Sequence, residues 1–112
     1  MLTIFLPAVW CYAADTYDGY SAIQVKEANV QHTPKGSSIQ ATIDGHYLTV
    51  VFTENLGQVA VEITTSSGTP VEYLAMTTPN GQVFYIALPG DYIVNFTLSN
   101  GDEYYGEFTV TD

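Results

Sequence analysis

Hydrophobic and polar residues alternate along residues 39–112 in short runs that are separated by turn signals. The run at residues 58–64 is the clearest, because Val59, Val61 and Ile63 share one parity while polar or small residues take the other. A period of two places successive side chains on opposite faces of a β-strand. The dipeptides Asp-Gly, Ser-Gly, Asn-Gly and Pro-Gly between the runs mark turns. This pattern predicts a succession of half-buried strands.

Seven strands are predicted in this region, at residues 39–43, 48–52, 58–64, 71–76, 84–88, 92–98 and 104–110. Asn80-Gly81 is expected to turn the chain into the fifth strand, on which Phe84, Ile86 and Leu88 face inward. Short strands at a spacing of about 8–12 residues are typical of sandwiches. The predicted fold class is therefore all-β, an immunoglobulin-like antiparallel β-sandwich of about seven strands.

Residues 14–38 are polar and irregular, and His32-Thr33-Pro34-Lys35-Gly36-Ser37-Ser38 reads as a loop. We expect at most one edge strand here, near Ala22–Val25. The domain organisation predicted after the N-terminal apolar run is thus a polar segment over residues 14–38 and the sandwich over residues 39–112.

Residues 1–13 form an apolar run that is too short to span a bilayer and ends in small residues. This pattern predicts a secretory signal peptide, and hence a periplasmic or extracellular protein. Met1-Leu2-Thr3 lacks the expected Lys or Arg, which is compatible with a start that lies upstream. Two alternatives stay open: a true N-terminal strand, and a lipid anchor at Cys11, although Trp10 stands where a small residue is expected. Cleavage after Ala13 leaves a mature chain without cysteine.

The chain is strongly acidic, with 12 carboxylate and 2 cationic residues and a net charge of −10. Both cations, Lys26 and Lys35, precede residue 39, while residues 39–112 carry nine carboxylates. Nucleic acid and anionic membrane surfaces need a basic patch, so neither is a predicted partner, and no stable membrane insertion is expected. Mutual repulsion of the carboxylates is expected to raise their pKa values.

No catalytic site or cofactor is predicted. His32 and His46 have no second His or Cys at metal-ligand spacing, and a nucleophile elbow is absent from the sequence. A calcium site is a further hypothesis, because an immunoglobulin-like topology gathers the loops at residues 53–57, 77–81 and 100–102 at one end and calcium binds oxygen-rich loops. The candidate ligands there are Glu54, Asp102 and Glu103, although their spacing is not that of a calcium loop.

Tyrosine is enriched, with nine in the chain. The parity of the last strand sends Tyr104 inward and Tyr105 outward, beside Glu103 and Glu107. Exposed tyrosines can stack on a sugar ring or anchor a partner protein, so the ligand-binding candidates are Tyr105, Tyr47 and Tyr85. The alternative is that these tyrosines only cover a sheet, which suits their strand propensity.

Three segments carry a family resemblance: Ile39–Gly45, Leu48–Gly57 and Leu88–Phe96. They resemble the small secreted immunoglobulin-like domains of unassigned function from anaerobic gut bacteria, over about residues 23–110. The resemblance implies secretion and the sandwich fold, and it brings no catalytic or ligand residues.

Fold alone does not select a function. The leading hypothesis is a secreted, non-catalytic protein-interaction or adhesion module whose partner is an unknown protein or glycan. The alternatives are a carbohydrate-binding accessory domain and a structural subunit that assembles through an edge strand.

Overall fold

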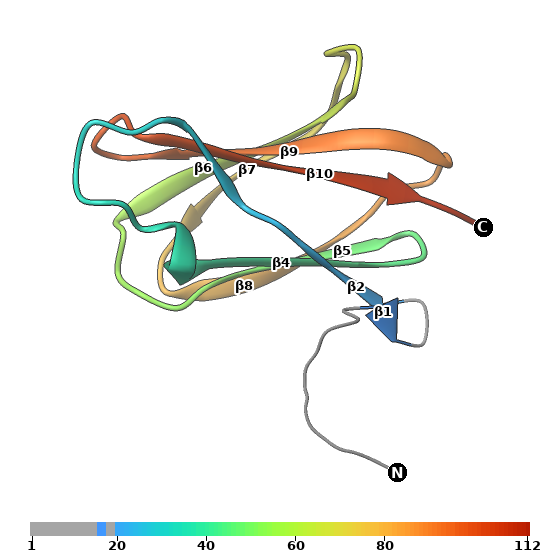
Figure 1. The fold of residues 1–112 in the computed structure, drawn as a ribbon, viewed down its shortest axis with the longest axis horizontal. Helices are drawn as coiled ribbons and strands as arrows, with labels where there is room; N and C mark the ends of the chain where they lie inside the picture. Colours follow the sequence, from blue (N-terminus) through green and yellow to red (C-terminus); the bar gives the residue numbers. More distant parts are fainter. Residues whose placement is uncertain (1–15, 18–19) are drawn as a thin grey trace, which may run out of the picture.

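The computed structural model describes residues 16–17 and 20–112, so the predicted signal peptide at residues 1–13 and Cys11 lie outside the described residues. Two antiparallel sheets pack face to face (Figure 1). We call them sheet A and sheet B. Sheet A has the strand order β1 (Thr16–Tyr17), β2 (Tyr20–Ile23), β4 (Ile39–Asp44), β5 (Tyr47–Phe52) and β8 (Asn80–Tyr85). Sheet B has the order β3 (Lys26–Asn29), β10 (Glu103–Val110), β9 (Gly90–Leu98), β6 (Gln58–Thr65) and β7 (Pro70–Thr77).

The strands β4 to β10 form the predicted immunoglobulin-like sandwich. The hairpins β4–β5, β6–β7 and β9–β10 each stay within one sheet, and the connections between them cross from one sheet to the other. A single turn of 3₁₀-helix, η1 (Gly36–Ser38), leads into β4.

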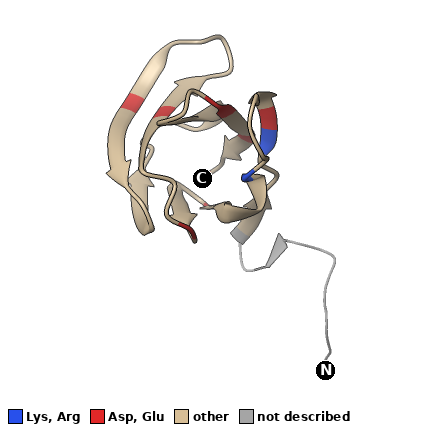
Figure 2. Ribbon diagram, turned by 90° about the vertical axis from the view of Figure 1, so that its left-hand side faces the viewer, with Lys and Arg blue, Asp and Glu red and all other residues tan. Residues whose placement is uncertain are grey.

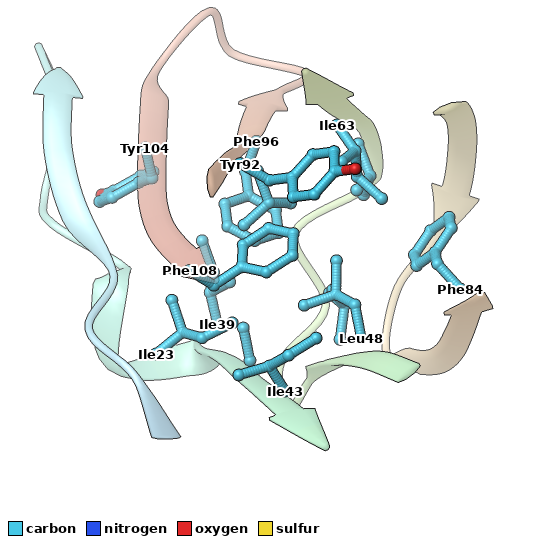
Figure 3. Close-up of a cluster of buried hydrophobic side chains, with 14 of the residues drawn as sticks. Ile23, Ile39, Ile43, Leu48, Ile63, Phe84, Tyr92, Phe96, Tyr104 and Phe108 are labelled. Carbon is cyan, nitrogen blue, oxygen red and sulfur yellow. The ribbon is translucent and has the colours of Figure 1, made fainter. Parts of the chain in front are cut away.

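The core lies between the sheets and is built from the inward parity of each strand (Figure 3). Val59, Val61 and Ile63 on β6 are fully buried, as the alternation predicts. Phe52 of sheet A meets Phe96 of sheet B edge to face, with 5.9 Å between the ring centroids. Such contacts between large buried side chains hold the two layers together without a disulfide in the described chain.

The expectation of at most one strand before residue 39 is wrong. Strand β2 pairs with β4 in sheet A, and β3 then pairs with β10 in sheet B. The N-terminal segment therefore extends both sheets and closes one side of the sandwich. Strand β3 could not be predicted from alternation, because all four of its residues are exposed and hydrophobic and polar positions do not alternate in it.

Gly106 allows the chain to cross between the sheets at this point. A Cβ atom at this position of β10 would lie 2.6 Å from Cγ2 of Ile23 and 3.3 Å from the carbonyl oxygen of Gln24. The distance to Ile23 is shorter than Cβ atoms tolerate, so the close approach of the N-terminal segment to β10 depends on a glycine here.

Two further details differ from the sequence prediction. Asn80 and Gly81 are the first residues of β8 rather than a turn, because the chain already reverses at Thr78-Pro79, which has a cis peptide bond. Leu88 is 72% exposed rather than buried, because β8 ends at Tyr85. The backbone carbonyl of Leu88 accepts a hydrogen bond of 2.5 Å from the hydroxyl of Tyr92, the contact that defines a tyrosine corner.

Candidate functional site

Tyr47 and Tyr85 lie side by side on the outer face of sheet A. They are direct cross-strand partners on β5 and β8, and their ring centroids are 5.3 Å apart with an interplanar angle of 54°. Their side-chain neighbours along each strand, Leu48 and Phe84, point into the core, which leaves the two tyrosines 53% and 56% exposed. The structure therefore brings two of the three tyrosine candidates together as one aromatic surface.

His46 completes this aromatic group from the turn between β4 and β5. Its ring stacks on Tyr85, with 5.7 Å between centroids. Nδ1 lies 2.7 Å from the carbonyl oxygen of Ile86, and Nε2 lies 2.6 Å from Oδ1 of Asp112. Both partners accept hydrogen bonds, so the doubly protonated imidazolium satisfies both contacts. The Ile86 carbonyl, followed by the Asp112 carboxylate, raises the pKa of His46 above its usual value.

The surface beside the tyrosines is shallow and nearly uncharged. A depression of about 400 Å³ on β4 and β5 is lined by Gln40, Thr42, Asp44, Tyr47, Thr49 and Val51. Val83 of β8 stands across from Thr49 and is 54% exposed. Asp44 is the charged residue among the outward positions of β4, β5 and β8. We call the surface formed by Tyr47, Tyr85, His46 and Val83 the tyrosine face.

Tyr105 lies elsewhere, on the outer face of sheet B. The predicted parity is confirmed, since Tyr104 is 1% exposed and Tyr105 is half-buried and points outward. Its partners across the sheet are Asn95 on β9 and Lys26 on β3, and Nζ of Lys26 lies 6.0 Å from its ring centroid. The sequence did not predict β3, and Lys26 of this strand covers part of the Tyr105 ring. Tyr105 therefore does not contribute to the tyrosine face.

The three calcium candidates do not converge in the structure. The loops that carry them do gather at one end, as Leu56 N–H donates to Oγ1 of Thr78 (2.6 Å) and the Ser99 hydroxyl donates to the Leu56 carbonyl (3.3 Å). Glu54, however, accepts hydrogen bonds from the Ser38 hydroxyl and the Lys35 ammonium. Within the described residues, no three His, Cys, Asp or Glu side chains are grouped so that they could hold a metal ion.

Asp102 instead anchors the N-terminal segment. Its Oδ1 accepts hydrogen bonds from the backbone N–H of Gln31 and from Nδ1 of His32, each at 2.9 Å. Its side chain is 1% exposed, and Oδ2 is buried with no hydrogen-bond partner among the described residues. Glu103, the neighbouring candidate, is exposed at the start of β10, opposite Asn29.

The expected effect of carboxylate repulsion is wrong for two of these groups. The Ser38 hydroxyl, and then Lys35, lower the pKa of Glu54 below its usual value. The backbone N–H of Gln31, and then the His32 ring, lower the pKa of Asp102. Donors in direct contact with a carboxylate outweigh more distant like charges, which are screened by solvent.

His46, Val83 and Asp112 were not predicted from the sequence as members or supports of the tyrosine face. His46 was considered for metal binding and not for stacking on an aromatic ring. The strand order of an immunoglobulin-like sandwich, which pairs β5 with β8, is the signal that places Tyr47 beside Tyr85. Nothing in the local sequence indicates the contact of His46 with Asp112, which lies 66 residues away.

Comparison with known structures supports the fold. The chain is similar to a DUF3244 family protein from Bacteroides vulgatus that has an immunoglobulin-like β-sandwich fold. The TM-score is 0.68 at 16% sequence identity, and the match covers 82% of this chain and 99% of the other. The predicted resemblance to bacterial immunoglobulin-like domains is thereby confirmed at the level of the fold.

No family model matches the chain, and the comparison with curated proteins gave no match. Among the described residues, no helix is long and apolar enough to cross a membrane.

Proposed function

We propose that this protein is a secreted, non-catalytic interaction module that contacts a partner protein through the tyrosine face. The observation that carries the proposal is the cross-strand pair Tyr47–Tyr85, in which both side chains are more than half exposed. Tyrosine is enriched at protein interfaces because its ring supplies contact area with few rotatable bonds and its hydroxyl can hydrogen-bond at the rim.

The chemistry of the face supports binding rather than catalysis. His46 is the residue of the tyrosine face that could act as a general base. Both of its ring nitrogens already face hydrogen-bond acceptors, so neither is free to take a proton from a substrate. The outward neighbours are threonines, a glutamine, valines and Asp44, which can contact a partner and are not arranged as a nucleophile with its base. The similarity to a domain of unknown function agrees with this assignment without adding a ligand.

A carbohydrate is the second candidate ligand, and the depression beside Tyr47 favours it. Gln40, Thr42, Asp44 and Thr49 line this depression and offer hydrogen-bond donors and acceptors next to an aromatic ring. A neutral sugar that stacks on Tyr47 could reach these groups. The anionic character of the chain disfavours acidic polysaccharides.

Binding arrays separate these candidates. The purified chain is applied to a panel of neutral glycans and to a panel of extracellular protein domains, in parallel with Tyr85→Ser and Tyr105→Ser. We expect a protein ligand whose binding is weakened at least tenfold by Tyr85→Ser and is unchanged by Tyr105→Ser. Retention on a glycan that Tyr85→Ser abolishes would establish the carbohydrate alternative. Loss of binding with Tyr105→Ser alone would move the site to sheet B and refute the proposal.

A further inference from the structure

Strand β7 is the outer strand of sheet B and has no described neighbour on one of its sides. It is eight residues long, and the residues from Tyr73 to Thr77 pair with β6 in continuous register. A long edge strand offers a row of backbone donors and acceptors that another extended segment can pair with.

The register identifies which backbone groups of β7 point to the open side. Thr78 N–H donates to the carbonyl of Gly57 at 3.1 Å, so Gly57 and Thr78 form a hydrogen-bonded pair. The next pair along the ladder, Gln58 and Thr77, is therefore a non-bonded pair. Hydrogen-bonded and non-bonded pairs alternate in an antiparallel ladder. Leu74 and Met76 therefore bond to β6, while the N–H and C=O groups of Tyr73, Ala75 and Thr77 point away from it. These last three residues are exposed.

The two edges of sheet B are protected very differently. The opposite edge, β3, is four residues long, carries Lys26 and Glu27, and has a register shift against β10. Short length, charge and irregular register are the devices that stop an edge from pairing further. Strand β7 is twice as long as β3 and has Glu72 as its single charged residue. Its own register shift against β6, between Ile63 and Thr64, and Pro70 both lie at its first residues, so the ladder from Glu72 to Thr77 is uninterrupted.

The charge around β7 selects the occupant. Glu72 lies on the strand itself, and Glu62 on β6 is the cross-strand partner of Tyr73. Figure 2 shows the lysine colour on one side of the sandwich, whereas the acidic colour is spread around it. A second copy of the chain would bring another net charge of −10 to the same edge, which opposes self-pairing. A basic segment of another protein is instead attracted to this edge by Glu72 and Glu62.

We propose that the β7 edge binds an extended, lysine- or arginine-bearing segment of a partner protein, which adds to sheet B as one more strand. Main-chain hydrogen bonds to Tyr73, Ala75 and Thr77 supply the pairing. A basic side chain opposite Tyr73 can lie against its exposed ring, with the Glu62 carboxylate on the next strand. The inference rests on the proposed function only in that the partner is a protein, since it uses a different surface.

The test uses a fluorescent, blocked heptapeptide, acetyl-Lys-Val-Lys-Thr-Lys-Val-Lys-amide, titrated with the full chain and followed by fluorescence polarisation. The matched control peptide has Glu in place of every Lys. We expect the lysine peptide to bind with an affinity that falls as salt rises, and the glutamate peptide not to bind.

Two variants locate the binding on the edge. Ala75→Pro removes an outward N–H without removing a bond to β6, and Ala75→Lys keeps every backbone donor but places a positive charge on the edge. We expect each variant to weaken binding at least tenfold, whereas Tyr85→Ser leaves it unchanged. Circular dichroism shows whether each variant is folded. If Ala75→Pro does not fold, Ala75→Lys alone tests whether the peptide binds at the β7 edge.

Three results would overturn the proposal. One is absence of binding, and another is binding that the folded Ala75→Lys variant leaves intact. The third is a concentration-dependent dimer of the wild-type chain that Ala75→Lys abolishes, which would make a second copy the occupant. Because Tyr85→Ser is the variant that tests the tyrosine face, failure of either surface is distinguishable from failure of the other.

Discussion

The hydroxyl of Tyr104 accepts a hydrogen bond of 2.7 Å from the backbone N–H of Lys35, 69 residues earlier in the chain. Tyr104 is 1% exposed, so its ring belongs to the core while its hydroxyl holds the N-terminal segment in place just before η1. One side chain thereby connects the packing of the sandwich to the position of the segment that closes its side.

Substitutions at Tyr104 should separate these two roles. We expect Tyr104→Phe to cost about 1 kcal/mol, because it removes one hydrogen bond and keeps the ring. Tyr104→Ala should cost ~3–5 kcal/mol, as for other buried aromatic truncations. Tyr105→Ala is the control and should cost less than ~1 kcal/mol, since it loses a half-exposed ring and its contact with Lys26. Urea unfolding gives all three values, and equal losses for Tyr104→Ala and Tyr105→Ala would refute the assigned register.

A methyl group at Gly106 should displace the N-terminal segment. We expect Gly106→Ala to destabilise the fold by ~1–3 kcal/mol, because the new Cβ would overlap Cγ2 of Ile23. Gly81→Ala on β8 is a matched control, since its Cβ would meet Val51 at an ordinary 3.5 Å. Hydrogen exchange should show the loss of protection for Gly106→Ala on β2 and β3. A Gly106→Ala protein as stable as Gly81→Ala would mean that the segment does not pack as described.

Stability should be greatest at mildly acidic pH. The pKa of His46 is raised, so its contribution is complete below its usual value of 6.5 and is lost as pH rises through the folded-state value. The pKa values of Glu54 and Asp102 are lowered, so their contributions are present above the usual 4.5 and 3.8 and are lost as pH falls. All three contributions coexist between about pH 4.5 and pH 6.5.

Melting temperatures measured from pH 3 to pH 8.5 test this window. His46→Gln should flatten the decline on the alkaline side and leave the acid side unchanged. Asp102→Asn should reduce the decline on the acid side. If the alkaline decline persists in His46→Gln, its cause is the repulsion among carboxylates and not the contacts of His46 with Ile86 and Asp112.

Calcium should not stabilise the protein. Oδ1 of Asp102 is already occupied by Gln31 N–H and His32, and Glu54 is held by Ser38 and Lys35. We expect the melting temperature to change by less than about 1 °C between millimolar calcium and a chelator, since a ligand that does not bind the native state cannot shift it. A calcium-dependent rise that Asp102→Asn removes would restore these residues as a cation site.

The sequence predicted the parts of the fold that depend on local alternation. Tyr104 and Tyr105 were assigned to opposite faces correctly because successive strand residues always face apart. Strand β3 could not be predicted in this way, since its pairing with β10 comes from a strand about 75 residues away and leaves its own residues exposed. Leu88 was assigned inward by extending the parity of β8 past Tyr85, where the strand ends.

The candidate site was less predictable for a related reason. Tyr47 and Tyr85 were identified singly as exposed, but their contact depends on the order of strands in sheet A. Asp102 reads as a turn residue in the sequence, and its burial is set by donors from Gln31 and His32. Long-range pairing decides both features, and no short-range pattern carries that information.

The pairing of β3 with β10 also determines when the molecule can assemble during its synthesis. Residues emerge in order from the N-terminus, so β2 can pair with β4 early, whereas β3 and the contact of Ile23 with Gly106 lack their partner until β10 has been made. Such a chain completes its structure late and slowly, as expected where contacts join distant parts of the sequence.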